Sequence, residues 1–175
     1  MSIQESQFQA GRLDRAVTLI VDDHFFMRSI MKTILVSLGA PQCIEASDAV
    51  QAFEILSNNP CDLVITDYHL GGLNGAELTK LLRCAGDTAH AHVPIIGCTA
   101  DSRRRIVKEF VDAGVDELLV KPISPVQVWS RLHNIITARR PFVQAPTYFG
   151  PERRRKANPT YSGPERRRQP AAMAQ

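Results

Sequence analysis

The distribution of apolar and polar residues divides most of the chain into short apolar runs and longer segments between them. Five runs of strand length, several rich in Val and Ile, alternate with five segments of helical length or spacing. The expected strands are residues 16–21, 43–45, 62–66, 93–98 and 117–120. The expected helices are residues 25–38, 48–56, 76–84, 102–113 and 124–137.

Turn-forming residues separate these segments. Apolar residues recur at every fourth position from Phe26 to Leu38, and Gly39, Ala40 and Pro41 then end the first helix. Ser47 is the expected N-cap of the second helix. Strands that alternate with helices predict a parallel sheet joined by right-handed crossovers, with helices on both faces. The expected fold class is therefore α/β, with a doubly wound five-stranded sheet.

Charge marks a second division of the chain. The whole sequence has a formal net charge of +3, but residues 139–175 contain nine Lys or Arg and two Glu, a net charge of +7. Residues 1–138 therefore carry a net charge of −4. We expect an N-terminal extension at 1–15, one folded domain at 16–138 and a basic tail at 139–175.

The cysteines and the lengths of the apolar runs indicate the cellular compartment of the protein. The four cysteines lie far apart without a Cys-x-x-Cys pair, and we expect them to be buried thiols in a reducing compartment. The first fifteen residues are polar and mixed in charge, unlike a signal peptide. Apolar runs fall short of the roughly 18 residues that cross a bilayer. We therefore expect a cytoplasmic protein with no transmembrane segment.

Chemically active side chains follow four of the predicted strands. Asp22 and Asp23 follow the first strand, and Asp67 ends the third. Thr99 ends the fourth strand, and Lys121 follows the fifth. Because the carboxyl ends of parallel strands meet at one edge of the sheet, three carboxylates, a hydroxyl and an ammonium should converge there.

This set of groups favours phosphoryl transfer to a carboxylate. A nucleotide-binding fold would carry a glycine-rich phosphate loop after the first strand, whereas the two acids there suit a hard divalent cation. We predict that Asp67 is the nucleophile and that Asp23 and Asp67 hold Mg²⁺, with Asp22 behind them. Lys121 and Thr99 would contact the other phosphoryl oxygens.

Four short segments together resemble the receiver domain of two-component response regulators. They are Val21–Asp23, Ile65–Asp67, Cys98–Ala100 and Val120–Pro122, in the order and at the spacing of that family. The resemblance covers roughly residues 17–136. It implies a flavodoxin-like fold with five helices, and phosphorylation by a partner histidine kinase or histidine phosphotransfer protein.

The resemblance also assigns roles to individual positions. It implies that Asp67 is the phosphoacceptor and that the backbone carbonyl of His69 completes the Mg²⁺ ligands. His69 and Asp101 occupy positions that tune the lifetime of the phosphoryl group in this family. Two residues depart from the family pattern: Gly71 replaces the usual proline, and Leu118 replaces the usual aromatic switch residue.

The tail contains a repeated octapeptide. Residues 148–155 (YFGPERRR) recur as residues 161–168 (YSGPERRR), with seven identities at a step of 13 residues. Gly-Pro pairs and scarce apolar residues favour disorder from residue 141 onward. The arginines suit docking on an acidic protein face first, on nucleic acid second and on anionic lipid third. They are Arg153, Arg154, Arg155, Arg166, Arg167 and Arg168. A variant of docking on a protein face is a phosphorylation-sensitive contact with the protein's own acidic receiver.

These patterns favour a single-domain response regulator that signals through protein contacts. Residues 101–122 are a candidate surface for a downstream protein, although Arg103–Arg105 are equally consistent with a solvated helix face. One alternative is a nucleic-acid-binding regulator whose arginine repeats are gated by the receiver. Another is a phosphorylation-independent adaptor. We expect a phosphoacceptor that assists its own phosphorylation and dephosphorylation, not an enzyme with a separate substrate.

Overall fold

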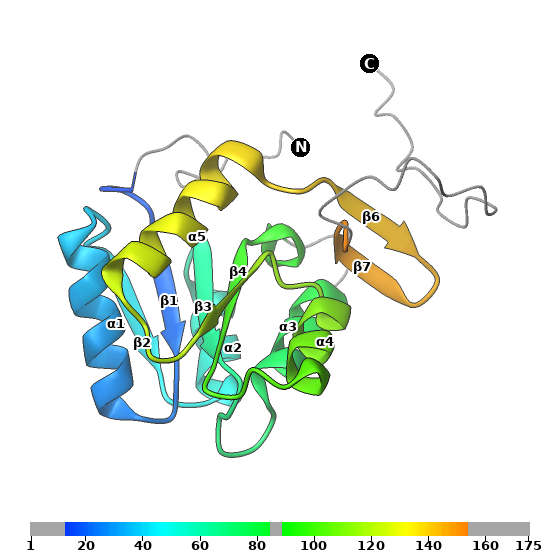
Figure 1. Ribbon diagram of the computed structural model, residues 1–175, viewed down its shortest axis with the longest axis horizontal. Coiled ribbons are helices and arrows are strands. Elements are labelled where there is room, and N and C mark those ends of the chain that lie inside the picture. Colours follow the sequence, from blue (N-terminus) through cyan, green and yellow to red (C-terminus); the bar gives the residue numbers. More distant parts are fainter. Residues whose placement is uncertain (1–12, 85–88, 154–175) are drawn as a thin grey trace.

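A computed structural model describes residues 13–84 and 89–153 (Figure 1). The strands of the main sheet are β1 (Thr18–Val21), β2 (Cys43–Ala46), β3 (Leu63–Asp67), β4 (Ile95–Thr99) and β5 (Glu117–Val120). The helices are α1 (Phe25–Ser37), α2 (Ala49–Asn58), α3 (Gly75–Cys84), the 3₁₀ helix η1 (Ala89–His92), α4 (Arg104–Ala113) and α5 (Pro125–Ala138). Two further strands, β6 (Phe142–Ala145) and β7 (Tyr148–Pro151), form a hairpin.

The main sheet is parallel throughout, with the strand order β2-β1-β3-β4-β5. The predicted flavodoxin-like α/β fold is therefore confirmed. Both ends of every predicted strand and helix lie within two residues of the observed ends. In the described part of the chain, no helix is both long enough and apolar enough to cross a membrane.

Successive residues of each strand point to opposite faces of the sheet, and this alternation builds two apolar cores. Leu19 and Val64 join α2, α3 and α4 in one core. Their neighbours Ile20 and Ile65 join α1 and α5 in the other. Figure 1 shows the sheet between these two layers of helices. Both faces are covered, which explains why the strand sequences are mostly apolar and do not alternate between apolar and polar residues.

Polar side chains fix where helices begin. Ser124 and Gln127 form a reciprocal capping box at the start of α5. The N-cap of α2 is Asp48, whose carboxylate accepts the amide of Gln51 at 2.9 Å. The expectation of Ser47 as the cap was wrong, because Ser47 instead directs its hydroxyl toward the side chains of Asp48 and Gln51.

The expectation of disorder from residue 141 is wrong for residues 142–151, which form the β6–β7 hairpin. Tyr148 is buried, and Phe142 and Phe149 pack on each other and on His92 with ring centroids 5.0–5.4 Å apart. Arg140 donates to the carbonyl of Glu152 and to two carbonyls before β5. A two-stranded hairpin is marginal alone, so these contacts with the domain supply its stability.

A buried ion pair holds this end of the domain together. Asp116, just before β5, pairs with Arg83 of α3 at 3.0 Å and with Arg139 at 2.8 Å. Arg83 also donates to the carbonyls of Ala91, Val93 and Gly114. Burial lowers the pKa of Arg83 to about 10, although Asp116 opposes the shift, so Arg83 remains charged at neutral pH. Both guanidinium groups also lie against the ring of Phe142.

The thiols follow the sequence expectation only in part. Cys98 is buried and Cys43 and Cys61 are partly buried, but Cys84 is exposed at the end of α3. The expectation of a buried thiol was therefore wrong for Cys84. Burial raises the pKa of Cys61 to about 11 and also raises the pKa of Cys98, so both stay protonated at neutral pH.

We predict that Arg83→Ala lowers the free energy of unfolding by about 3 kcal/mol, because it leaves Asp116 with fewer partners and three buried carbonyls without a donor. Urea denaturation followed by circular dichroism measures the change. The control is Lys80→Ala, which removes an exposed cation from the same helix and should change stability by less than about 0.5 kcal/mol. Equal losses in the two variants would contradict the prediction.

Candidate functional site

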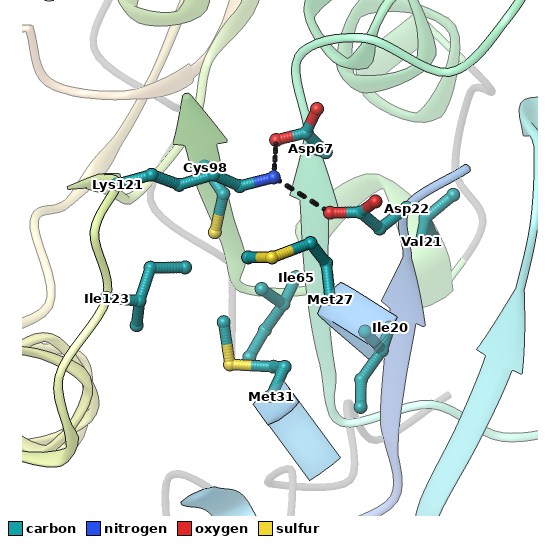
Figure 2. Close-up of a pocket in the computed structure, with 10 residues that line it drawn as sticks. All are labelled: Ile20, Val21, Asp22, Met27, Met31, Ile65, Asp67, Cys98, Lys121 and Ile123. Atoms are coloured by element: carbon teal, nitrogen blue, oxygen red, sulfur yellow. Dashed lines mark hydrogen bonds and ion pairs between the residues drawn. The ribbon is translucent and has the colours of Figure 1, made fainter. Parts of the chain in front are cut away.

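Two carboxylates and one ammonium meet at the carboxyl edge of the main sheet (Figure 2). Lys121 Nζ lies 2.9 Å from Asp22 Oδ2 and 2.7 Å from Asp67 Oδ1. The three side chains are 17%, 8% and 7% exposed, respectively, so water screens this triad only weakly. The structure therefore brings together Asp22, Asp67 and Lys121 as the sequence predicts.

The triad is held by charge and by backbone amides. Burial alone would lower the pKa of Lys121. The hydrogen bonds to Asp67 and Asp22, together with their negative charges, outweigh burial and raise the pKa above its usual value. Asp67 Oδ2 accepts the amide of His69 at 2.9 Å, and Asp22 Oδ1 accepts the amide of His24 at 2.9 Å. Each carboxylate thus has one oxygen on a backbone amide and the other on Lys121.

Asp23 lies at the more exposed rim of the site. Its side chain is 34% exposed, and Asp23 Oδ1 lies 2.6 Å from His24 Nδ1. Ligand atoms of Asp22, Asp23 and His24 all lie within 4.8 Å of one another. His24 was not among the residues predicted from the sequence, and neither was Arg28, which donates to the carbonyl of Asp22 at 2.7 Å and so fixes the chain at the end of β1.

Thr99 ends β4 as predicted, but its hydroxyl is directed toward the turn before α4. Thr99 Oγ1 accepts the amide of Asp101 at 3.0 Å and lies 3.2 Å from the carbonyl of that residue. Asp101 in turn accepts the amide of Arg103 and pairs with its guanidinium. The hydroxyl must therefore turn its hydrogen away from the carbonyl of Asp101 before it can donate to a group on Asp67.

The two departures from the family pattern have different structural consequences. Gly71 has a φ of +69°, a conformation that proline cannot adopt, so the loop after Asp67 follows a path that suits glycine. Leu118 is half-buried and packs against the core beneath α4. Its aliphatic side chain offers no hydrogen bond, so another residue must supply any polar link between the site and the helices.

Tyr68, which directly follows Asp67, supplies such a link. Its side chain is buried, and its hydroxyl donates to Glu109 Oε2 on α4. The ring packs edge-on against Phe110, with centroids 5.5 Å apart. This pair was not predicted from the sequence, because the two residues are 41 positions apart and neither is an unusual residue for a strand end or a helix.

The space beneath the triad is small. Lys121 and the two carboxylates cover a cavity of about 10 Å³, which is lined on its inner side by Met27, Met31, Cys98 and several isoleucines (Figure 2). That volume holds about one water molecule. An organic substrate would therefore have to bind outside it, on the open rim of the sheet.

Arg153 is the only predicted arginine of the repeats that lies in the described part of the chain. Its guanidinium pairs with Asp112 Oδ1 at 2.7 Å and lies over the ring of Tyr148. The pairing with Asp112 joins the repeat to an acidic residue of the same chain, and the docking of the repeats on a partner stays a prediction. The other predicted arginines lie outside the described residues; they are Arg154, Arg155, Arg166, Arg167 and Arg168.

Comparison with known proteins gives a consistent result. The family described as "Response regulator receiver domain" matches residues 18–133. The chain is 35% identical over 117 residues to chemotaxis protein CheY-3 of Vibrio cholerae, covering 67% of this chain and 88% of that protein. It is also 35% identical over 111 residues to sensor histidine kinase RcsC of Escherichia coli, covering 63% of this chain but only 11% of that protein.

A solved structure is similar over nearly its whole length. It is the receiver domain of the sensor histidine kinase PA1611 from Pseudomonas aeruginosa, which has a magnesium ion coordinated in its active site cleft. The TM-score is 0.63 at 25% sequence identity, over 70% of this chain and 98% of that one.

We predict that Lys121→Met lowers the free energy of unfolding by about 2 kcal/mol at pH 7, because Asp22 and Asp67 then lose their shared cation. A group whose pKa is raised in the folded state stabilises that state below its ordinary pKa of 10.5. The difference between wild type and variant should therefore persist up to pH 9 and shrink as the pH rises through the folded-state pKa.

Urea denaturation at pH 7, 9 and 11 measures this difference. The matched control is Lys80→Met, which removes an exposed lysine from α3. A difference between wild type and Lys121→Met that grows above pH 10 would contradict the assigned ion pairs.

Proposed function

The chain belongs to the response regulator receiver domain family, and on that premise we propose that Asp67 accepts a phosphoryl group from a phosphohistidine. The donor is a sensor histidine kinase or a histidine phosphotransfer protein. The observation that carries the proposal is the ion pair of Lys121 with both Asp67 and Asp22 at the carboxyl edge of the sheet.

The transfer requires few catalytic groups. A carboxylate oxygen of Asp67 attacks the phosphorus, the P–N bond of the phosphohistidine breaks with its electrons going to the imidazole, and an acyl phosphate forms. Lys121 stays beside the new phosphate and stabilises its charge. Thr99 turns away from Asp101 and donates its hydroxyl to a phosphoryl oxygen. Attack by water on the acyl phosphate later releases inorganic phosphate and restores the carboxylate.

The donor atoms at the rim fit a divalent cation. Asp22, Asp23 and Asp67 offer hard carboxylate oxygens, with Asp23 the most exposed of the three, and the family resemblance adds the backbone carbonyl of His69. Bound Mg²⁺ would neutralise charge on the transferring group. The magnesium site of the Pseudomonas aeruginosa receiver domain supports this part of the proposal.

The output of the switch, in this proposal, is a change in contacts with a downstream protein. The match to CheY-3 covers 88% of that protein, and the described residues after α5 add only the β6–β7 hairpin. In this proposal the receiver domain itself makes those contacts. The proposal places it in the cytoplasm, where its four free cysteines stay reduced.

The same proposal describes a phosphoacceptor and not an enzyme with a separate substrate. The carboxylate that receives the phosphoryl group belongs to the protein itself, and the cavity beneath it has room for about one water molecule. The protein assists both the gain and the loss of its own phosphoryl group through Lys121 and Thr99.

Phosphoryl incorporation from acetyl phosphate tests this function directly. We expect Mg²⁺-dependent incorporation into wild type, at a stoichiometry approaching one, and none into Asp67→Asn, because an amide is a poor nucleophile. Intact-mass spectrometry measures the added phosphoryl group. The control is Asp14→Asn, which changes an exposed carboxylate outside the site and should label as wild type does.

Two results would overturn the assignment. Labelling that persists in Asp67→Asn would place the acceptor elsewhere. Absence of labelling in wild type, with acetyl phosphate and with a phosphorylated histidine phosphotransfer protein, would favour a phosphorylation-independent adaptor.

A further inference from the structure

Helix α4 contacts both the loop of the phosphoacceptor and the first arginine repeat. Its residue Glu109 accepts the hydroxyl of Tyr68, which directly follows Asp67. Three positions later, Asp112 accepts Arg153 at 2.7 Å. Residues three apart lie on the same side of a helix. One side of α4 therefore connects the proposed site of phosphorylation with the repeat.

We propose that α4 couples the phosphorylation of Asp67 to the docking of the first arginine repeat, and that phosphorylation releases Arg153 from Asp112. Tyr68 is the positioning residue at one end of this connection. The inference rests on the proposed function of Asp67, and it adds a regulated output, namely the availability of the arginine repeat to a partner.

The connection at Tyr68 is firmly held. The backbone amide of Tyr68 donates to the carbonyl of Cys98, and its carbonyl accepts the amide of Gly75, both at 2.8 Å. The side chain is 7% exposed and packs against Phe110. The hydroxyl donates to Glu109 Oε2, which joins the side chain of Tyr68 directly to α4. A displacement of the loop after Asp67 is therefore passed to α4.

Phosphorylation supplies the displacement. Thr99 Oγ1 is bonded to Asp101 at the start of the turn that leads into α4. If Thr99 donates its hydroxyl to the phosphoryl group, the carbonyl of Asp101 loses this donor, and the turn into α4 loses one of the contacts that hold it. Leu118 has no polar group that could hydrogen-bond to the site and link this change to the helices. Tyr68, in contrast, connects the loop after Asp67 to α4 through its hydrogen bond with Glu109.

The connection at Arg153 is the weaker one. The side chains of Arg153 and Asp112 are 49% and 31% exposed, and exposed ion pairs contribute little to stability. Asp112 is also shared with Lys108, one turn earlier on α4, at 2.5 Å. Hydrogen bonds from Lys108 and then Arg153 lower the pKa of Asp112. A small movement of α4 can leave Asp112 paired with Lys108 alone and set Arg153 free.

Hydrogen–deuterium exchange of the full chain tests the coupling. The peptide of interest covers residues 142–153, where the amide of Glu152 is bonded to the carbonyl of Pro141 at 2.8 Å. With acetyl phosphate and Mg²⁺, we expect exchange in this peptide to accelerate about two- to fivefold in wild type. Asp67→Asn should show no acceleration. Arg153→Gln should exchange rapidly whether or not the donor is present.

The decisive variant is Tyr68→Phe, which removes the hydroxyl and keeps the ring. It should incorporate phosphoryl groups to the wild-type extent, yet its exchange at residues 142–153 should no longer respond. Glu109→Ala removes the acceptor of the same hydrogen bond on α4 and should behave alike. The matched control is Glu54→Ala, an exposed glutamate on α2, which should keep the full response.

The outcomes separate the coupling from the proposed function. If wild type is phosphorylated but exchange at residues 142–153 is unchanged or slower, the release of Arg153 is wrong. If Tyr68→Phe responds as wild type does, the connection through Tyr68 is wrong. If Asp67 accepts no phosphoryl group, the proposed function and the coupling fail together.

Discussion

The accumulation of negative charge at the carboxyl edge of the sheet is the constraint on which the rest of the structure depends. A parallel sheet brings Asp22 and Asp67 together from different strands, and burial leaves them little water to screen their repulsion. Lys121 offsets that repulsion by pairing with both, and backbone amides take the remaining oxygens. The site therefore holds one buried cation against two anions, with Asp23 beside them. An additional cation fits this edge, and so does a reaction that transfers an electrophilic phosphoryl group to one of the acids.

The opposite edge of the sheet has the reverse balance. There the buried carboxylate of Asp116 faces both Arg83 and Arg139, and neighbouring carbonyls accept the remaining guanidinium donors. The surplus of positive charge lies against the ring of Phe142, whose electron-rich face accommodates it. This arrangement explains why the β6–β7 hairpin belongs to the domain. The hairpin completes a charged cluster that the five-stranded fold alone would leave partly open.

The fold and most of the site could be predicted from the sequence because both follow from the regular alternation of strand and helix segments along the chain. Alternating strands and helices determine the sheet, and the sheet determines that Asp22, Asp67 and Lys121 meet. The direction of the Thr99 hydroxyl did not follow, since it depends on the local turn around Asp101. The hairpin was missed because its stability comes from contacts far along the chain, such as Phe149 with His92, while its own sequence contains turn-forming residues. Tyr68 was missed for the same reason: its partner Glu109 is near only in the folded protein.

Helix α4 connects the two edges of the sheet. The helix runs from the turn beside Thr99 to Gly114, whose φ of +98° ends it next to Arg83 and β7. Contacts at the middle of the helix are buried and include the aromatic packing of Phe110, whereas the contact of Asp112 with Arg153 is exposed and shared. When a rigid helix is displaced, its weakest contact breaks first, and here that contact is the exposed ion pair of Asp112 with Arg153. In the proposed coupling, this break sets Arg153 free.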